Sequence, residues 1–364
     1  MKSEIHIVLV WEKGLKKFDA ILYDLKNSFE ILDVFKINWS KDFFSNNLSR
    51  FYGQSLPNRS FKEKHCGKGA FKVVIIKQNN PQYKKRKTSK GNIVVNSVLF
   101  DKKHLYRNWT GGGHKVHTSN NKEEARHNFF FLFNKDIQLY LKSDSWSGKI
   151  HNLDNDIKGF NGWKDFDELF NFVNQSSNYI ILRNYSNIES AKSNYSDIDF
   201  LTSDRDFIYH INGNKKHIQD DRVACEIKIG NKFYNSDIRF CDDGYYDSNW
   251  AKNMLDNKVI FQGKFFVPDC LNEFYSLLYH ALIHKNTLTD KYNEKLSNLS
   301  LELGFNFESS IFRSREKSIS ILNKFLNQNQ YKITRPKDFS VQYSYGNKGL
   351  KRYLWEMIGR IKNG

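Results

Sequence analysis

The stretch Ser196-Asp197-Ile198-Asp199-Phe200-Leu201 decides the fold of the second half of the chain, because charged and apolar residues alternate within it. Alternation of this kind is typical of a β-strand that places its two aspartates on one face and its apolar residues on the other. Further along, the segment Asn235-Ser236-Asp237-Ile238-Arg239-Phe240 predicts a second strand with an aspartate. Carboxylates on neighbouring strands are ligands for Mg²⁺ or Mn²⁺. The predicted metal ligands are Asp197, Asp199 and Asp237.

The chain has 364 residues, which favours two domains rather than one. Hydrophobic residues make up 39% and charged residues 27%, which excludes collagen and wholesale disorder. The 57 Lys and Arg outnumber the 40 Asp and Glu, giving a net charge of +17. This excess favours anionic partners such as nucleotides, nucleic acid, phosphorylated polymers or an anionic membrane face. The alternative is that an AT-biased genome enriched the chain in Lys, Asn, Ile and Phe together.

Neither a signal peptide nor an apolar run long enough to cross a membrane is visible in the sequence. The four cysteines are scattered and form no CxxC pair, so the sequence predicts neither a disulfide framework nor a cysteine zinc site. A reducing cytoplasm is therefore the expected location.

The pattern of apolar residues predicts an α+β protein in two parts. A strand, an amphipathic helix and a second strand open the first domain, which is expected over residues 1–142. Residues 143–161 are rich in turn formers and predict a linker. A second α+β domain with a mixed sheet is expected over residues 162–299. Residues 300–364 are expected to form a helical C-terminal region that includes a helix from Leu350 to Ile361.

The aspartates stand in an ordered series of elements. A strand at Ile180-Ile181-Leu182 precedes a short turn, and the two Asp-containing strands follow. In this order, residues 162–290 resemble the nucleotidyltransferase superfamily, which includes the DNA polymerase beta type and the minimal nucleotidyltransferases. The resemblance implies that the three aspartates are catalytic and hold the metal, and that a nucleoside triphosphate such as ATP is the substrate. It also implies contacts to that substrate from Arg183, Asn184, Ser186 and Arg239.

The turn departs from the family, which usually carries Gly-Ser where this chain has Arg183-Asn184. The departure removes the usual backbone cradle for phosphate. Arg183 is expected to supply a bidentate phosphate contact in its place.

Val116-His117-Thr118-Ser119-Asn120-Asn121, after three glycines at 111–113, is the distinctive string of the first half. With Glu123-Glu124-Ala125 and the helix behind it, the string resembles the active-site segment of nucleoside diphosphate kinases. The similarity covers about residues 3–135 and implies a ferredoxin-like βαββαβ core. It implies that His117 is the phosphohistidine position, with phosphate contacts from Tyr52, Arg86 and Thr88. Asparagines stand where that family has acids, at Asn120 and near Asn128, so the phosphoryl relay is expected to be slow.

Three further features have less specific interpretations. The run Lys84–Lys87 is expected on a loop, where it would contact phosphate or simply be solvated. The acidic and aromatic turn at 242–247 follows the third aspartate and would stack a base or pack as a surface turn. His280 and His284 lie four residues apart on one helix, and packing within the fold is a better interpretation than zinc binding.

Together these features predict a two-domain, Mg²⁺-dependent transferase that moves a nucleotidyl or related phosphoryl group from a nucleoside triphosphate to an acceptor. An anionic acceptor, such as RNA or a polysaccharide precursor, suits the net charge. One alternative makes His117 the primary catalyst of phosphoryl transfer. The other is a non-catalytic nucleotide- or RNA-binding protein.

Overall fold

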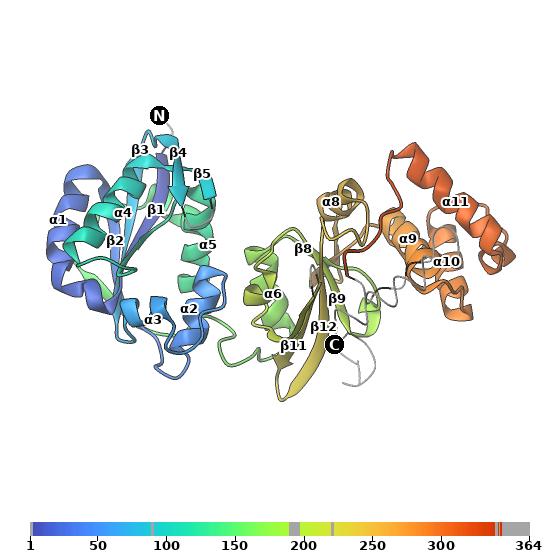
Figure 1. Ribbon diagram of the computed structural model, residues 1–364, viewed down its shortest axis with the longest axis horizontal. Coiled ribbons are helices and arrows are strands. Elements are labelled where there is room, and N and C mark those ends of the chain that lie inside the picture. Colours follow the sequence, from blue (N-terminus) through green and yellow to red (C-terminus); the bar gives the residue numbers. More distant parts are fainter. Residues whose placement is uncertain are drawn as a thin grey trace. The chain divides into compact units, whose positions relative to one another are not determined.

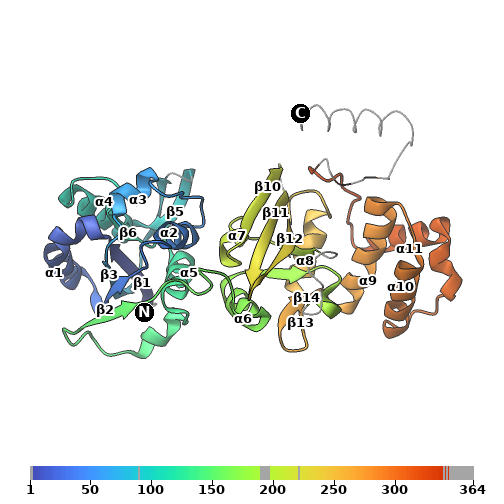
Figure 2. The same ribbon diagram turned by 90° about the horizontal axis from the view of Figure 1, so that it is seen from below.

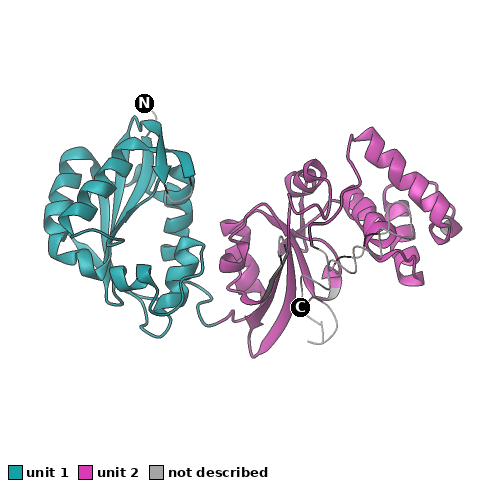
Figure 3. Ribbon diagram, in the orientation of Figure 1, with its two compact units in different colours: residues 1–161 teal, residues 162–364 magenta. Residues whose placement is uncertain are grey.

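The computed structural model describes residues 3–88, 91–188, 197–219 and 222–338, together with Val341 and Tyr343. The chain is α+β and divides into two compact units, Met1–Asn161 and Gly162–Gly364 (Figure 3). Within the described ranges, no helix is both long and apolar enough to span a membrane. The helix expected from Leu350 to Ile361 lies outside the described residues.

The first unit is built on a five-stranded sheet with the order β6-β1-β3-β2-β7. Helix α1 connects β1 to β2, and α4 leads into β6, so that the central elements run β-α-β-β-α-β along the chain. The strands are β1 (Ser3–Val10), β2 (Glu30–Asn38), β3 (Phe71–Asn79), β6 (Val116–Thr118) and β7 (Ile150–Asp154). The helices are η1 (Glu12–Lys17), α1 (Phe18–Ser28), α2 (Phe44–Tyr52), α3 (Phe61–Cys66), α4 (Ser97–Trp109), α5 (Lys122–Phe133) and η2 (Ile137–Lys142).

Helices cover both faces of this sheet (Figure 1). Alternate residues of β1 and β3, such as Val8 and Val74, share one core with α1 and α4. Helix α5 packs on the opposite face, where Phe133 lies 4.7 Å from Phe35 of β2 between ring centroids. The central strand β1 therefore buries both sets of its side chains, which explains why Ile5–Val10 is a nearly unbroken apolar run.

The segment 143–161, predicted as a linker, belongs to the first unit. Strand β7 within it pairs in parallel with β2. The buried guanidinium of Arg50 donates to the Lys158 carbonyl at 2.5 Å, and the Asn47 amide donates to Asp156 at 2.5 Å. The prediction of a linker is wrong because turn-forming residues here satisfy polar groups of α2 as well as making turns.

Strands β4 (Tyr83–Thr88) and β5 (Gly91–Asn96) form a separate two-stranded hairpin (Figure 1). The basic run expected on a loop therefore lies in β4, which corrects that prediction. The hairpin begins beside β3 and ends at α4, whose N-cap is Asn96.

The second unit has a mixed sheet with the order β10-β11-β12-β9-β8. Its strands are β8 (Tyr179–Ile181), β9 (Ile198–Thr202), β10 (Asn214–Gln219), β11 (Arg222–Ile229) and β12 (Lys232–Phe240), and a hairpin is formed by β13 (Val259–Phe261) and β14 (Phe265–Val267). The helices are α6 (Phe166–Ser176), η3 (Tyr185–Asn187), α7 (Phe207–His210), α8 (Ser248–Asp256), α9 (Cys270–Tyr279), the π-helix η4 (His280–Lys285), α10 (Asp290–Glu302), η5 (Ser309–Arg313) and α11 (Arg315–Gln328).

Helices α6 and α7 lie on one side of this sheet and α9 on the other (Figure 2). The apolar face of β9 packs toward α7, with Phe200 and Phe207 at 5.0 Å between ring centroids. On the other side, Ile180 and Leu201 join one core with residues of α9, α10 and α11. The boundary predicted at residue 299 falls inside α10, because the helical region shares this core with the sheet.

Candidate functional sites

The strands that carry the aspartates are neighbours in the second sheet. Strand β9 pairs with β12 in parallel, and the register places Asp199 beside Asp237. Paired residues of neighbouring strands project from the same face of a sheet. Asp199 is 13% exposed and Asp237 is 9% exposed, whereas Asp197, the residue before β9, is exposed. The sheet therefore carries two adjacent carboxylates that are mostly buried, and a third that is exposed to solvent.

Arg183 leaves the end of β8 and pairs with the nearer aspartate. Its Nε lies 3.0 Å from Asp199 Oδ2, and its Nη2 donates to the Tyr245 hydroxyl at 3.1 Å. Burial alone would lower the pKa of Arg183, but the charge of Asp199 together with Tyr245 and Tyr246 raises it. The predicted phosphate ligand is therefore a fixed cation in contact with a predicted metal ligand.

The remaining predicted substrate contacts of this unit occupy different positions. Asn184 is exposed and has a left-handed backbone (φ 59°), a conformation that glycine adopts freely. Ser186 is exposed in η3. Arg239 lies two residues beyond Asp237 on the same strand face, but its Nη1 is bound to Asp338 at 2.9 Å. Arg239 is thus engaged by a carboxylate from the segment after α11.

Two adjacent carboxylates fit a Mg²⁺ ion that keeps several of its ligands as water or phosphate oxygens. Among the residues that the structure describes, Asp197, Asp199 and Asp237 do not form a set of three whose ligand oxygens all lie within 4.8 Å. Asp199 and Asp237, which the register places side by side, stay the predicted ligands of the ion, and the role of Asp197 likewise stays a prediction.

Tyr245 connects this site to the helical region. Its hydroxyl lies 2.9 Å from His280 Nδ1, and its carbonyl lies 3.1 Å from His284 Nε2. Burial, followed by the charge of Arg183, lowers the pKa of both histidines well below the usual value. The two histidines therefore pack and hydrogen-bond within the fold, as expected.

His117 of the first unit is 5% exposed and lies on β6, next to β1. Its Nε2 is 2.8 Å from the Asn128 side-chain amide. The nearest carboxylate is that of Glu124, which caps α5 by accepting from the Asn120 backbone N–H at 2.6 Å and stays 4.0 Å from the imidazole. The ring is thus oriented by an amide and not by an acid. Because the amide can present either its oxygen or its nitrogen, it can bond to either tautomer of the imidazole.

Cationic side chains surround His117. Burial lowers its pKa well below the usual value, and the charges of Lys103, Arg107 and Lys62 lower it further. Lys103 is itself buried, which lowers its pKa to about 8. Arg107 is anchored through Nε to the Val116 carbonyl at 3.0 Å. A neutral imidazole among three cations is suited to an anionic ligand rather than to a metal ion.

The predicted phosphate contacts of this unit separate in the structure. Tyr52 lies beside His117, with ring centroids 5.4 Å apart, and burial raises the pKa of its hydroxyl well above the usual value. Arg86 and Thr88 lie instead on the β4–β5 hairpin, where Arg86 pairs with Asp101 at 3.4 Å and Thr88 bonds to the Gly91 carbonyl at 2.9 Å. The cations gathered around His117 come from α3 and α4.

Sequence reasoning missed those cations, although α4 carries a signal. Lys103 and Arg107 are four residues apart and therefore lie on one helix face, together with the core-facing Leu99. Charged residues at core-facing helical positions just upstream of the histidine would have indicated them.

No known protein family matches the chain, and no curated protein is similar to it. Among solved structures, the chain is similar to the nucleoside diphosphate kinase of Aquifex aeolicus, with 13% identity and a TM-score of 0.26. The matched region covers 36% of this chain and 96% of the kinase. At this level of similarity, the function has to be inferred from the chain's own residues.

Proposed function

We propose that the second unit transfers a nucleotidyl group from a nucleoside triphosphate to an acceptor hydroxyl, in a reaction that depends on Mg²⁺ or Mn²⁺. One observation carries the proposal: Asp199 and Asp237 stand side by side on parallel strands, with Arg183 3.0 Å from Asp199. This combination of two carboxylates and a cation suits a substrate that is a metal-bound polyphosphate.

The strand arrangement also supports the proposed relation to nucleotidyltransferases. Strand β8 runs antiparallel to β9, and β9 runs parallel to β12. The turn between β8 and β9 contains Arg183 and Asn184, and Asn184 has a left-handed backbone.

In this reaction, the acceptor oxygen attacks the α-phosphorus, the bond between the α-phosphorus and the bridging oxygen breaks, and pyrophosphate leaves. A divalent ion held by Asp199 and Asp237 would neutralise the triphosphate and favour an ionised acceptor. In this proposal the exposed carboxylate of Asp197 would accept the hydroxyl proton. Arg183 would exchange Asp199 for a phosphate oxygen, since both are anionic partners for its planar guanidinium group.

The decisive experiment follows the products of each nucleoside triphosphate with Mg²⁺. Nucleotidyl transfer releases pyrophosphate and moves an α-label to the acceptor, whereas phosphoryl transfer releases a nucleoside diphosphate and moves a γ-label. Release of pyrophosphate that requires both Asp199 and Asp237 is the expected result. Transfer of the γ-label alone would contradict the proposal.

A second candidate function belongs to the first unit, namely binding of nucleotide phosphates near His117. The buried Lys103, the half-buried Arg107 and the neutral imidazole support it. Phe61 adds a ring that is 68% exposed and packs at a tilt against His65 with centroids 4.1 Å apart, which leaves apolar surface for a base. Acid-labile phosphate on His117 would extend this candidate to phosphoryl transfer, and binding without such phosphate would limit it to recognition.

A further inference from the structure

The positive charge of the chain is concentrated in the first unit. Residues 1–161 contain 29 Lys and Arg against 15 Asp and Glu, a net charge of +14, whereas residues 162–364 contribute the remaining +3. Within the first unit, residues 64–100 contain nine Lys and Arg and no Asp or Glu. This stretch includes the whole β4–β5 hairpin, which the proposed transfer reaction does not use.

The register of the hairpin sorts its side chains into two faces. Lys85 is paired with Val94 and Lys87 with Asn92, so these four residues share a face with Tyr83. On the opposite face, Val95 is buried and Arg86 pairs with Asp101 of α4. The face that carries Tyr83, Lys85 and Lys87 is called here the lysine face.

Every residue of the lysine face named so far is exposed. Lys85 and Lys87 are exposed, and the exposed fractions of Tyr83 and Val94 are 37% and 51%. Residues two apart on a strand are about 7 Å apart, so the two ammonium groups can contact successive phosphates of an extended strand. Tyr83 and Val94 add apolar surface next to these charges.

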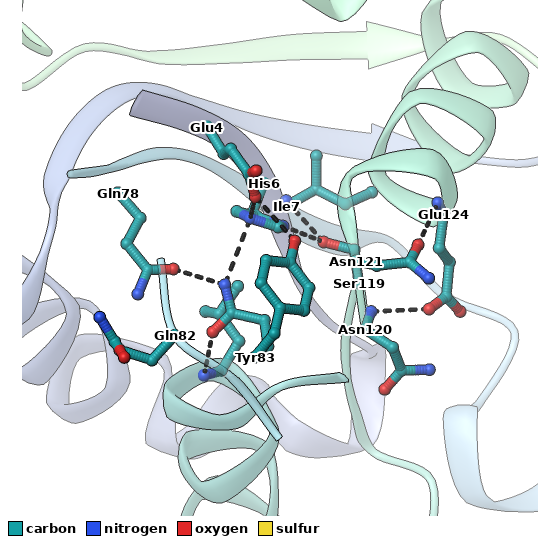
Figure 4. Close-up of polar contacts among 12 residues, drawn as sticks. Glu4, His6, Ile7, Gln78, Gln82, Tyr83, Ser119, Asn120, Asn121 and Glu124 are labelled. Carbon is teal, nitrogen blue, oxygen red and sulfur yellow. Dashed lines mark hydrogen bonds and ion pairs between the residues drawn. The ribbon is translucent and has the colours of Figure 1, made fainter. Parts of the chain in front are cut away.

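A buried polar network fixes the base of the hairpin (Figure 4). The Tyr83 hydroxyl donates to Glu4 Oε2 at 2.7 Å, and Glu4 lies 3.4 Å from His6 Nε2. Asn96, which is paired with Tyr83 across the hairpin, donates to Gln78 Oε1 at 2.6 Å. The ring of Tyr83 is therefore held in place before any ligand arrives, which lowers the entropy cost of binding.

The same network extends to the segment that follows His117. The Ser119 hydroxyl lies 3.1 Å from His6 Nδ1, and both side chains are fully buried. The hairpin base is thus anchored on β1, β3 and the end of β6, and it forms a rigid support for the exposed cations.

We propose that the lysine face of the β4–β5 hairpin binds single-stranded nucleic acid, with Lys85 and Lys87 on its phosphates and the Tyr83 ring against a base. Aromatic rings interleaved with cations are typical of surfaces that bind single strands, because an unpaired base is free to stack and the backbone supplies the negative charge. A duplex offers the same charge but keeps its bases stacked on one another.

The test measures fluorescence anisotropy of the full chain with labelled oligouridine and oligothymidine of about 12 nucleotides. Replacing Lys85 and Lys87 by Glu should weaken binding about tenfold or more and reduce the slope of log affinity against log salt by about 1.4, since each phosphate contact to a single strand contributes about 0.7. The matched control replaces Lys16 and Lys17 by Glu, which changes the net charge equally at two exposed positions of η1. The control should retain the wild-type slope.

Substitutions of Tyr83 test the contribution of base stacking separately from that of charge. Tyr83→Leu should weaken binding about fivefold or more, whereas Tyr83→Phe, which keeps the ring and loses only the bond to Glu4, should weaken it less. Circular dichroism and the thermal midpoint establish that each variant is folded.

Three outcomes would overturn the proposal. The first is an equal loss of binding in the Lys16 and Lys17 control, which would indicate diffuse attraction. The second is tighter binding to a duplex than to either single strand. The third is binding to phosphatidylserine vesicles that depends on Lys85 and Lys87 while oligonucleotides do not bind.

Discussion

The two candidate sites differ in the charge that they present to a ligand. Around His117, buried and half-buried cations lie near a neutral imidazole that contacts the amide of Asn128. In the second unit, two carboxylates lie side by side and one of them is paired with Arg183. The first arrangement suits an anion that arrives without a metal, and the second suits a metal-bound anion. The two proposed functions therefore imply two chemically distinct ways of binding a polyphosphate within one chain.

The largest expected effect concerns the carboxylate site. Asp199→Asn and Asp237→Asn should each reduce nucleotidyl transfer about 10³-fold, because several kcal/mol of charge stabilisation depend on the ligands of the ion. Pyrophosphate release measures the effect. Asp256→Asn, at an exposed position of α8, is the matched control and should transfer normally.

Asp199→Asn also leaves Arg183 without its carboxylate, which costs stability when a charge is partly buried. Rates are therefore compared per folded molecule, and Asp237→Asn provides the second variant. Normal turnover in both variants would refute the role of the carboxylate pair.

Much of this site follows from the sequence, because its residues lie in two short alternating segments. Alternation alone predicts that Asp199 and Asp237 lie on apolar strands, and the structure places those strands next to each other. The partners of the site were not predictable in the same way. Tyr245 reaches Arg183 from 62 positions further along the chain, and Asp338 reaches Arg239 from 99 positions further. Such contacts depend on tertiary packing, which local patterns do not encode.

The first unit gives the same lesson in another form. The sequence predicts the helix that follows the histidine string, because a capped helix is a local structure. The cap is Asn121, whose side chain accepts from the Glu124 N–H. Strand β7 was missed because five residues rich in turn formers join a sheet edge only through pairing with β2, which is more than 100 positions away.

The second-largest expected effect concerns the cations around His117. Lys103→Met should weaken binding of a nucleoside diphosphate about tenfold or more, because a charge-assisted contact to phosphate is lost. Since burial lowers the pKa of Lys103 to about 8, wild-type affinity should also fall as the pH rises above 8. Isothermal titration calorimetry measures both.

Lys102→Met is the control for this variant, because Lys102 is the next residue on α4 and pairs with Asp24 instead. If the Lys102 and Lys103 variants bind alike, the cations around His117 have no specific role in nucleotide recognition.

A smaller effect is expected for Arg183, the cation that is paired with one of the two carboxylates. Arg183→Gln removes the cation that lies 3.0 Å from Asp199, so Mn²⁺ without nucleotide should bind about fivefold more tightly to the pair. Transfer should nevertheless slow down, because a phosphate contact is lost. Electron paramagnetic resonance counts the bound Mn²⁺. Weaker Mn²⁺ binding in this variant would show that Arg183 supports the carboxylates rather than competing with the ion.

The smallest expected effect is the contribution of His117 to acid sensitivity. Burial lowers its pKa in the folded chain, so the unfolded chain binds the proton more readily between the folded pKa and the usual value of about 6.5. Unfolding is therefore favoured as the pH falls through this window, by about 1.4 kcal/mol per pH unit for one such histidine.

His117→Gln should remove this contribution to the pH dependence of stability. Thermal midpoints at a series of pH values between about 5 and 7 measure the change. An unchanged slope in His117→Gln would mean that the imidazole is protonated in the folded chain, and the anion site would then carry one more positive charge than the structure indicates.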